Sequence, residues 1–425
     1  MRLDVNVDVH HLTRVEGHGD IRIRIRDGQV EQAAWDVVET PRYFEAILRG
    51  KHYTTAGILT ARICGICSIG HALASVRASE DAFGTTVPPL AARLRLLAKH
   101  AETLQSHALH VLFLAAPDFL GLPSALPLAT EKPGLFALAA RIKKAANDLA
   151  DAVAGRTTHP VSIQVGGMAR RPTREQLEPV ARELEALAPA LGVIVDLVAG
   201  FVVPAFTRET EFVSLKAEGS YPWIGGRLVS SDGVDKPERA YREMTNEYVT
   251  AENTSKWCKL SRDSFAVGAL ARFNNNAVHL GPEARAAATR FGLAPVSHNP
   301  YMNNAAQVVE LVHVLHESLA LIDEVLGADG DEATLGDVTP REGEGVGAVE
   351  VPRGILYHHY RYGADGRIIK ADCVIPTTQN NANIHHDINA LAGAYAARGT
   401  TDAELERLAS MLVRAYDPCI SCSVH

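Results

Sequence analysis

The sequence RICGICSIGH (residues 62–71) shares its cysteine spacing with DPCISCSVH (residues 417–425), which ends the chain. Four thiolates brought together form a soft, all-sulfur site that suits zinc, an iron–sulfur cluster or another thiophilic transition metal. Because about 350 residues separate the two pairs, a shared site closes nearly the whole chain and orders a terminus that would otherwise fray. The cysteines concerned are Cys64, Cys67, Cys419 and Cys422.

The cysteine pattern alone leaves a structural four-cysteine zinc site open. Compact zinc modules place their pairs only about 15 to 20 residues apart, far less than here. Gly65 permits close backbone approach, and a helix that begins after Cys67 directs its positive dipole end at the thiolates. His71 follows one helical turn later, and we expect it to donate a hydrogen bond to a metal-bound sulfur. An ordinary core or surface histidine is the alternative.

The bulk composition is that of a globular protein: 425 residues, 47% hydrophobic and 22% charged. A net charge of -8 without blocks of like charge argues against a nucleic-acid or anionic-membrane surface. The most apolar stretch, residues 191–206, is interrupted by Asp196 and Pro204, so we predict a buried helix and no transmembrane segment. The N-terminus lacks an apolar signal core, which favours a cytoplasmic location, although a subunit exported with a partner needs no signal of its own.

Hydrophobic periodicity predicts three consecutive regions. Alternation in residues 3–9, 20–26 and 29–38 predicts an N-terminal β segment within residues 1–40. Helical periodicity then predicts a helical core over about 41–345, and a β hairpin with two closing helices over about 346–425. The predicted helices span residues 43–48, 69–83, 88–115, 135–153, 173–187 and 302–326. The C-terminal region is predicted as strands 347–361 and 367–375 and helices from about 384 and 402.

Together these elements predict an α+β fold that is predominantly helical, with a central bundle of long helices and small peripheral β-sheets. We expect a single domain over residues 1–425 because no linker interrupts the sequence. Neither of the common glycine-rich phosphate-binding motifs occurs, so we expect no nucleotide site.

The two cysteine stretches resemble the metal-binding signatures of the nickel–iron hydrogenase large subunit. Residues 122–264 are less diagnostic of this family. The compact length of the chain and the segment SHALHVLFLAAPDFLG look most like the cytoplasmic, multisubunit, cofactor-coupled branch of the family. Supporting similarity is carried by RVEGHGDI (14–21), YFEAILRGK (43–51), SHALHVLFLAAPDFLG (106–121), VGALARFN (267–274), VPRGILYHHY (351–360) and CVIPTTQN (373–380).

The resemblance implies a nickel–iron centre. Cys64 and Cys419 would be terminal ligands of nickel, and Cys67 and Cys422 would bridge to an iron that carries cyanide and carbon monoxide. Arg353 would reach over the site with its fixed fork of donors, oriented by the Asp118 carboxylate. Thr377, preceded by Pro376, would hydrogen-bond a cyanide nitrogen.

The implied reaction is the reversible heterolytic splitting of H2 into a hydride and a proton. The Cys419 thiolate would accept the proton first, and Glu16 would relay it outward; Arg353 would act as an alternative base or stabilise charge. Without the resemblance, Glu16 before Gly17 would be interpreted as a carboxylate in a turn, and Arg353 as a member of an ordinary surface ion pair.

A second ion is implied near the end of the chain. Glu45, which precedes Cys64 by 19 residues, and His425 would bind a hydrated Mg2+ together with the backbone carbonyl of Cys373. Because Mg2+ prefers oxygen ligands, iron is the alternative occupant. An end at His425 also resembles the product of a maturation protease that acts after nickel-insertion factors; a shortened chain is the alternative reading.

Two electrons must leave the site, and the remaining cysteines, Cys258 and Cys373, are isolated in the sequence. The resemblance therefore implies an iron–sulfur small subunit and further electron-transfer subunits that reduce NAD(P), a deazaflavin coenzyme or a heterodisulfide reductase. Two rival readings are a noncatalytic zinc-stabilised scaffold and the quinone-site subunit of respiratory complex I. The latter is similar in fold to the hydrogenase subunit but lacks the four metal cysteines.

Overall fold

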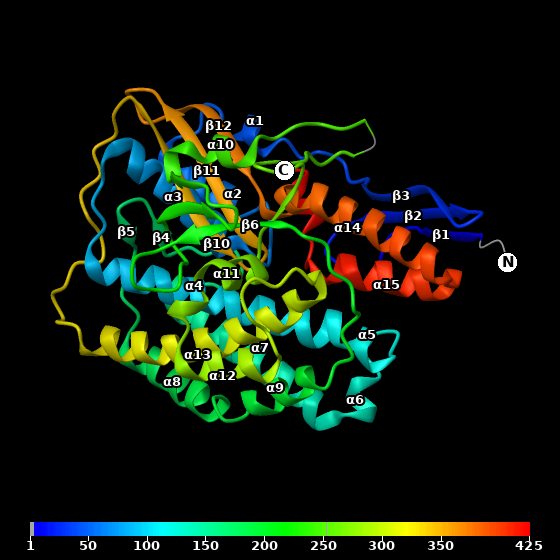
Figure 1. Ribbon diagram of the computed structural model, residues 1–425. Coiled ribbons are helices and arrows are strands. Elements are labelled where there is room, and N and C mark those ends of the chain that lie inside the picture. Colours follow the sequence, from blue (N-terminus) through cyan, green and yellow to red (C-terminus); the bar gives the residue numbers. More distant parts are fainter. Residues whose placement is uncertain (1–3, 252) are drawn as a thin grey trace.

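The computed structural model describes residues 4–251 and 253–425 (Figure 1). Long helices, among them α4 (Pro89–Leu109), α7 (Pro133–Ala154) and α13 (Asn303–Gly327), cross the lower half of the view. Small sheets lie around this bundle, and the C-terminus is near the middle of the view. The predicted class, an α+β fold dominated by helices with small sheets, is confirmed.

The N-terminal sheet consists of β1 (Val5–Val9), β2 (Gly19–Arg26) and β3 (Gln29–Val37), antiparallel and in chain order. Its alternating apolar residues are buried on one face, where α14 (Pro376–Arg398) and α15 (Asp402–Ala415) pack. Asp27 and Gly28 form the two-residue turn between β2 and β3, both with positive φ, as tight hairpins require. These strands match the prediction; Leu3, where the first was expected to begin, lies outside the described residues.

The helices predicted from periodicity form over nearly the expected residues. Gly84 ends α3 in the left-handed conformation, and the helix expected to reach residue 115 continues past α4 as a π-helical turn, His110–Ala115. Beside the three long helices named above, the α-helices described in the region expected to be helical are α1 (Phe44–Leu48), α2 (Tyr53–Thr60), α3 (Ser68–Phe83), α5 (Ala116–Leu120), α6 (Leu128–Glu131), α8 (Arg174–Leu187), α9 (Leu191–Ala199), α10 (Tyr241–Thr245), α11 (Ala269–Asn276) and α12 (Pro282–Arg290).

Two apolar segments differ in burial. The helical stretch Pro300–Gly327, which contains α13, is long and apolar enough to cross a membrane, but 78% of its most apolar window is buried in the fold, which is the setting of a core helix. The stretch predicted as a buried helix over residues 191–206 is helical only to Ala199. Val202 beyond it is 88% exposed, so that part of the prediction is wrong.

Several strands form inside the region predicted to be helical. A four-stranded sheet has the order β8-β7-β6-β9, and a two-stranded sheet pairs β4 with β5. β6 is buried along nearly its whole length, so its sequence does not alternate, and the other strands are too short to show a period. The bounds are β4 (Ile163–Gln164), β5 (Gly167–Met168), β6 (Glu211–Lys216), β7 (Arg227–Ser230), β8 (Asp235–Pro237) and β9 (Phe265–Ala266).

The C-terminal region departs from the prediction at two points. The strand expected over residues 347–361 is a hairpin, β10 (Gly343–Val351) and β11 (Gly354–Tyr362), followed by β12 (Ile368–Val374). Gly354 has a φ of 136°, and a Cβ there would lie 2.3 Å from Val267, so the turn holding Pro352 and Arg353 needs glycine.

The last helices follow this sheet. α14 (Pro376–Arg398) begins eight residues before the expected start, because its first turns are buried although their side chains are polar, which hides the helical period. α15 (Asp402–Ala415) begins where predicted, and the short α16 (Ile420–Ser423) lies in the C-terminal stretch.

Strand β10 lies directly on helix α3. A Cβ on Gly347 would be 2.2 Å from the carbonyl oxygen of Ala74, and one on Gly345 would be 2.3 Å from that of Ala78. The two backbones approach so closely that only glycine fits on the facing strand positions. The helix that follows the first cysteine pair is thereby joined rigidly to the strand that leads to Arg353.

We expect Gly347→Ala to destabilise the protein by about 1–3 kcal/mol, because the added methyl group would have to push β10 away from α3. Gly393→Ala is the matched control: Gly393 lies in α14 with no atom near its Cβ position, and alanine is the better helix former by up to about 1 kcal/mol. The measurement is denaturant unfolding of both variants. Equal stability of the two would contradict the close packing of β10 on α3.

Candidate metal centre

The structure brings the four paired cysteines into one buried cluster. Cys64 and Cys67 lie in the loop before α3, and Cys419 and Cys422 lie at the start and inside of the α16 turn. The Sγ atoms of Cys64 and Cys419 are 3.6 Å apart, those of Cys67 and Cys422 are 3.8 Å apart, and all four lie within 4.8 Å of one another. The two ends of the chain therefore meet at a cluster that has the donor atoms and spacing of a four-sulfur metal site.

The four cysteines differ in protonation and in bonding. The hydrogen bond with Cys67 lowers the pKa of the Cys64 thiol, and the charge of Arg353 lowers it further against the effect of burial. The same bond, together with burial, raises the pKa of Cys67, so Cys64 ionises first. The sulfurs of Cys419 and Cys422 are in contact as a disulfide, and binding of a metal by all four sulfurs requires this pair in the thiolate form.

The C-terminal stretch is held in place by the loop before β2. Gly17 has a φ of 84°, and a Cβ there would lie 2.7 Å from the Cβ of Ile420. The Ile420 N–H donates to the carbonyl oxygen of Glu16 at 3.0 Å, and Glu16 bridges to Cys419 in a parallel register. Arg42 adds a guanidinium that donates to the carbonyl oxygens of both Ser421 and Ile63, one on each cysteine stretch.

Glu16 lies beside the cluster, as the resemblance implies for a proton relay. Its carboxylate accepts the Ser421 N–H at 3.1 Å and the Ser421 hydroxyl, and the residue is only partly buried. The carboxylate thus has one side against the cysteine turn and a partial opening to solvent. Its role in proton transfer stays a prediction.

Asp417, and not Asp118, is the carboxylate that orients Arg353. Arg353 Nε donates to the Asp417 carbonyl oxygen at 2.7 Å, and its Nη2 donates to Asp417 Oδ1 at 2.9 Å. Asp118 instead accepts from Arg14 and from Arg414 at 2.8 Å, so the predicted pairing is wrong. Asp118 ties the N-terminal loop to α15, whereas Asp417 precedes the second cysteine pair by two residues.

Arg353 retains one unused donor group. Its side chain is 4% exposed, and Nη1 is buried without a hydrogen-bond partner among the described residues. Burial by itself lowers the pKa of Arg353, but Asp417 and the sulfurs of Cys64 and Cys67 raise it above its ordinary value. A permanently charged, buried and unpaired donor beside the cysteines fits a group there that offers an outward-facing acceptor atom.

Thr377 provides a second donor at the cluster. Pro376 occupies the first position of α14, and Thr377 follows it, accepting the Cys419 N–H on Oγ1 at 2.9 Å. Because the oxygen is the acceptor in that bond, its own hydrogen remains available. Four sulfurs with two available donors nearby suit a thiophilic metal centre that carries acceptor ligands.

A buried polar chain extends from Asp417, and sequence reasoning missed it. Gln307 Nε2 donates to Asp417 Oδ2 at 3.2 Å, and Gln307 Oε1 lies 2.5 Å from Nδ1 of His110. His110 Nε2 in turn lies 2.7 Å from the carbonyl oxygen of Arg414. The positive φ of Asp417 and the π-helical turn at His110 are local irregularities of the kind found at functional sites, but neither can be read from a sequence.

The residues proposed for the second ion also lie together. Glu45 Oε1 accepts the Cys373 N–H at 2.9 Å and lies 3.7 Å from His425 Nε2. Burial raises the pKa of Glu45, but the nearby His425 and the hydrogen bond from the Cys373 N–H outweigh it and lower the pKa. The predicted ligand from Cys373 was its carbonyl oxygen; the contact that the structure displays is through its N–H.

His71 is buried beside His358 rather than exposed. Its Nδ1 lies 3.2 Å from Nε2 of His358, and burial together with His358 lowers the pKa of His71 well below its ordinary value. The ring is therefore neutral and carries a single N–H. Donation from His71 to a cysteine sulfur stays a prediction.

The comparisons with known families agree with this cluster. The family model described as nickel-dependent hydrogenase matches residues 42–137 and 302–425, ranges that contain both cysteine pairs. A second model, described as HoxL-like, matches residues 6–40, which contain Glu16.

Relatives match over nearly the full length. Sulfhydrogenase 2 subunit alpha of Pyrococcus furiosus is 34% identical, with 99% of this chain and 98% of the relative covered. The NAD-reducing hydrogenase HoxS subunit beta of Cupriavidus necator is 27% identical, with 97% and 93% covered. The crystal structure of an NAD+-reducing [NiFe]-hydrogenase in the H2-reduced state is similar with a TM-score of 0.88 at 29% identity, over 99% of both chains. The chain thus belongs to the nickel-dependent hydrogenase family, as a large, catalytic subunit that acts on H2.

Proposed function

We propose that this subunit cleaves and forms H2 at a nickel–iron centre held by its four paired cysteines, with an iron that carries cyanide and carbon monoxide. The observation that carries the proposal is the buried four-sulfur cluster with the charge of Arg353 beside it, whose buried Nη1 has no hydrogen-bond partner among the described residues. A zinc scaffold would leave that buried donor without a partner. A complex I-like subunit would have no use for the cysteines.

The side chains around the cluster have complementary tasks. A bound nickel–iron pair supplies the electrophile that polarises H2 and accepts two electrons, so that one H2 yields two protons and two electrons. The Cys419 thiolate takes the first proton, and Glu16, bridged to Cys419 along the backbone, passes it toward solvent. Arg353 keeps its charge and acts through that charge and its hydrogen bonds rather than as a base.

Glu45, His425 and the Cys373 carbonyl are proposed to share a hydrated Mg2+, or an iron ion in its place. The 3.7 Å between Glu45 Oε1 and His425 Nε2 is long for a hydrogen bond but needs little adjustment for two ligands of one ion. The ion would pin the C-terminal residue to β12 and so close the cysteine turn.

Electrons leave through partner subunits in this proposal. Cys258 and Cys373 are buried and do not belong to the four-cysteine cluster, so the chain has no evident ligand set for an iron–sulfur relay among its described residues. An iron–sulfur small subunit, and further subunits that reduce a soluble acceptor in the cytoplasm, would complete the enzyme. Nickel-insertion factors and a maturation protease would act before the tail closes.

Metal analysis tests the centre directly. We expect the purified hydrogenase complex to contain about one nickel per large subunit and infrared absorptions of metal-bound carbon monoxide and cyanide. Cys67→Ser should lose both, because a serine hydroxyl is a poor ligand for soft metals. Cys258→Ser, in a separate hydrophobic cluster, should keep both. Zinc without these absorptions would overturn the proposal.

We expect Arg353→Lys to lower the rate of H2 oxidation by about 100-fold while nickel content stays normal, since lysine lacks the rigid fork with which arginine can donate to Asp417 and to the site in one fixed geometry. Arg93→Lys, which alters a half-buried ion pair with Glu332 outside both cysteine stretches, should leave the rate unchanged. The assay is H2-dependent dye reduction per nickel. A fully active Arg353→Lys enzyme would refute the role assigned to this guanidinium.

Glu16→Gln should lower H2 oxidation by about 100-fold at normal nickel content, because the amide keeps the acceptor for Ser421 but cannot carry a proton. Glu39→Gln is the control, since Glu39 is a nearby carboxylate paired with His18. Rates of hydrogen–deuterium exchange with solvent should fall in Glu16→Gln alone. Equal exchange rates in both variants would remove Glu16 from the proton route.

A further inference from the structure

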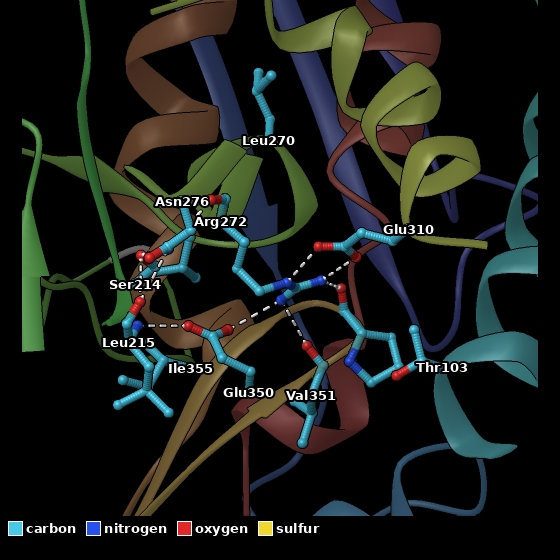
Figure 2. A network of polar contacts seen from close by, with 12 residues as sticks. Thr103, Ser214, Leu215, Leu270, Arg272, Asn276, Glu310, Glu350, Val351 and Ile355 are labelled. Atoms are coloured by element: carbon cyan, nitrogen blue, oxygen red, sulfur yellow. Dashed lines mark hydrogen bonds and ion pairs between the residues drawn. The ribbon is translucent and has the colours of Figure 1, made fainter. Parts of the chain in front are cut away.

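Arg272 of α11 is fully buried, and all five of its N–H donors have acceptors (Figure 2). Nε and Nη2 donate to the two carboxylate oxygens of Glu310 at 2.6 and 2.7 Å. Nη1 donates to Glu350 Oε2 and to the carbonyl oxygen of Val351, both at 3.0 Å. Nη2 also donates to the carbonyl oxygen of Pro352 at 3.1 Å. No donor is spare, so the guanidinium has a single orientation.

Two of these acceptors are the backbone carbonyls that immediately precede Arg353. Val351 ends β10 and Pro352 begins the turn to β11, and this turn also holds Arg353, which lies near Cys64 and Cys67. Glu350 at the end of β10 is held a second time, since its Oε1 accepts the Leu215 N–H of β6 at 2.7 Å. Figure 2 displays the guanidinium between Glu350 and Glu310, with Val351 directly below it.

The same helices hold the partner of Arg353. Asn303, at the start of α13, accepts the Leu270 N–H of α11 at 3.0 Å and donates to the Ala415 carbonyl oxygen at 2.7 Å. Gln307, one turn further along α13, donates to the Asp417 carboxylate. The turn that carries Arg353 and the segment that carries Asp417 are therefore both fastened to the α11–α13 pair.

We propose that Arg272 is a positioning residue for H2 turnover: by gripping the carbonyls of Val351 and Pro352 it sets where the Arg353 guanidinium stands over the four-sulfur site. The inference rests on the proposed nickel–iron function and extends it to a residue that does not touch the cluster. Hydrogen bonds at the backbone and at the side-chain tip together leave Arg353 little freedom, and misplacement by about 1 Å at such a site costs about 100-fold in rate.

A purely stabilising role would be served better by other residues. Burying one guanidinium and two carboxylates carries a desolvation cost that well-packed apolar residues avoid. Burial raises the pKa of Glu310, but the Arg272 charge outweighs it and lowers the pKa, so this carboxylate is ionised. Glu310 also accepts from His107 and from Tyr221, each at 2.7 Å. The network instead fixes orientation, because each hydrogen bond requires its donor and acceptor to be aligned.

Arg272→Lys is the test, because lysine keeps the charge but has three donors for five acceptors. Arg95→Lys is the matched control. Arg95 is also buried, forms a two-bond pair with Glu80 and donates to the carbonyl oxygens of Gln164 and Gly167, and none of its hydrogen bonds goes to the turn of Arg353. Both variants are made in the complete hydrogenase complex, and nickel content, infrared absorptions of the iron ligands and H2 oxidation are measured.

We expect Arg272→Lys to shift the cyanide absorptions and to lower kcat by about 10- to 100-fold at normal nickel content, while Arg95→Lys changes neither. In an enzyme that already carries Arg353→Lys, adding Arg272→Lys should lower kcat little further, because the side chain that Arg272 positions is already altered. Unchanged absorptions and rate in Arg272→Lys, or a fully additive loss in the double variant, would overturn the inference.

If Arg272→Lys fails to bind nickel, Glu310→Gln decides the question, since it keeps the shape of the acceptor and loosens Arg272 from the α13 side. A loaded Glu310→Gln enzyme should have cyanide absorptions shifted as well, to a smaller extent, and unshifted absorptions would reject the positioning role. A wild-type complex without nickel or without these absorptions would instead reject the proposed function itself.

Discussion

The structure depends on the closure of the chain upon itself, in which the nine-residue C-terminal stretch packs against the loop before α3. The α16 turn is far too short to be stable alone, so its geometry comes from what surrounds it. Because Gly17 has no side chain, Ile420 can pack close to it. Arg42 joins the two cysteine stretches by donating to a carbonyl oxygen on each. The sulfur cluster can therefore form only when the N-terminal loop, the first cysteine stretch and the tail are in place together.

Around this closure the fold uses polar side chains where most cores use apolar ones. The first half of α13, residues 303–315, is buried on all sides, yet it contains Asn303, Gln307 and Glu310, each fixed by hydrogen bonds. These contacts determine direction as well as distance, because each requires its donor and acceptor to be aligned. Close backbone packing of β10 on α3 has the same consequence for the main chain, since neither element can shift without collision at Gly347.

The carboxylate that pairs with Arg353 could not be predicted from the sequence. Asp118 was the expected partner of Arg353, but it accepts from Arg14 and Arg414 and so joins the N-terminal loop to α15. Asp417 takes the expected role, although nothing in its neighbourhood except the nearby cysteines marks it. Several buried arginines and carboxylates could pair in many ways, and only the distances in the folded chain select among them. The hairpin at Pro352 and Arg353 escaped prediction for a related reason, because its strands are buried on both faces and lack alternation.

By itself, the amino-acid sequence determined what is local or chemical: the alternation of the N-terminal strands, the period of the long helices, and four thiols in two spaced pairs that suit a thiophilic metal. The tertiary structure alone decided which distant groups meet. It paired Arg353 with Asp417, left Nη1 of Arg353 unpaired, and gave all five donors of Arg272 acceptors on α13, β10 and the turn after β10. Periodicity reports which face of an element is buried, but hydrogen bonds between residues far apart in sequence follow from the packing of whole elements, which no local pattern encodes.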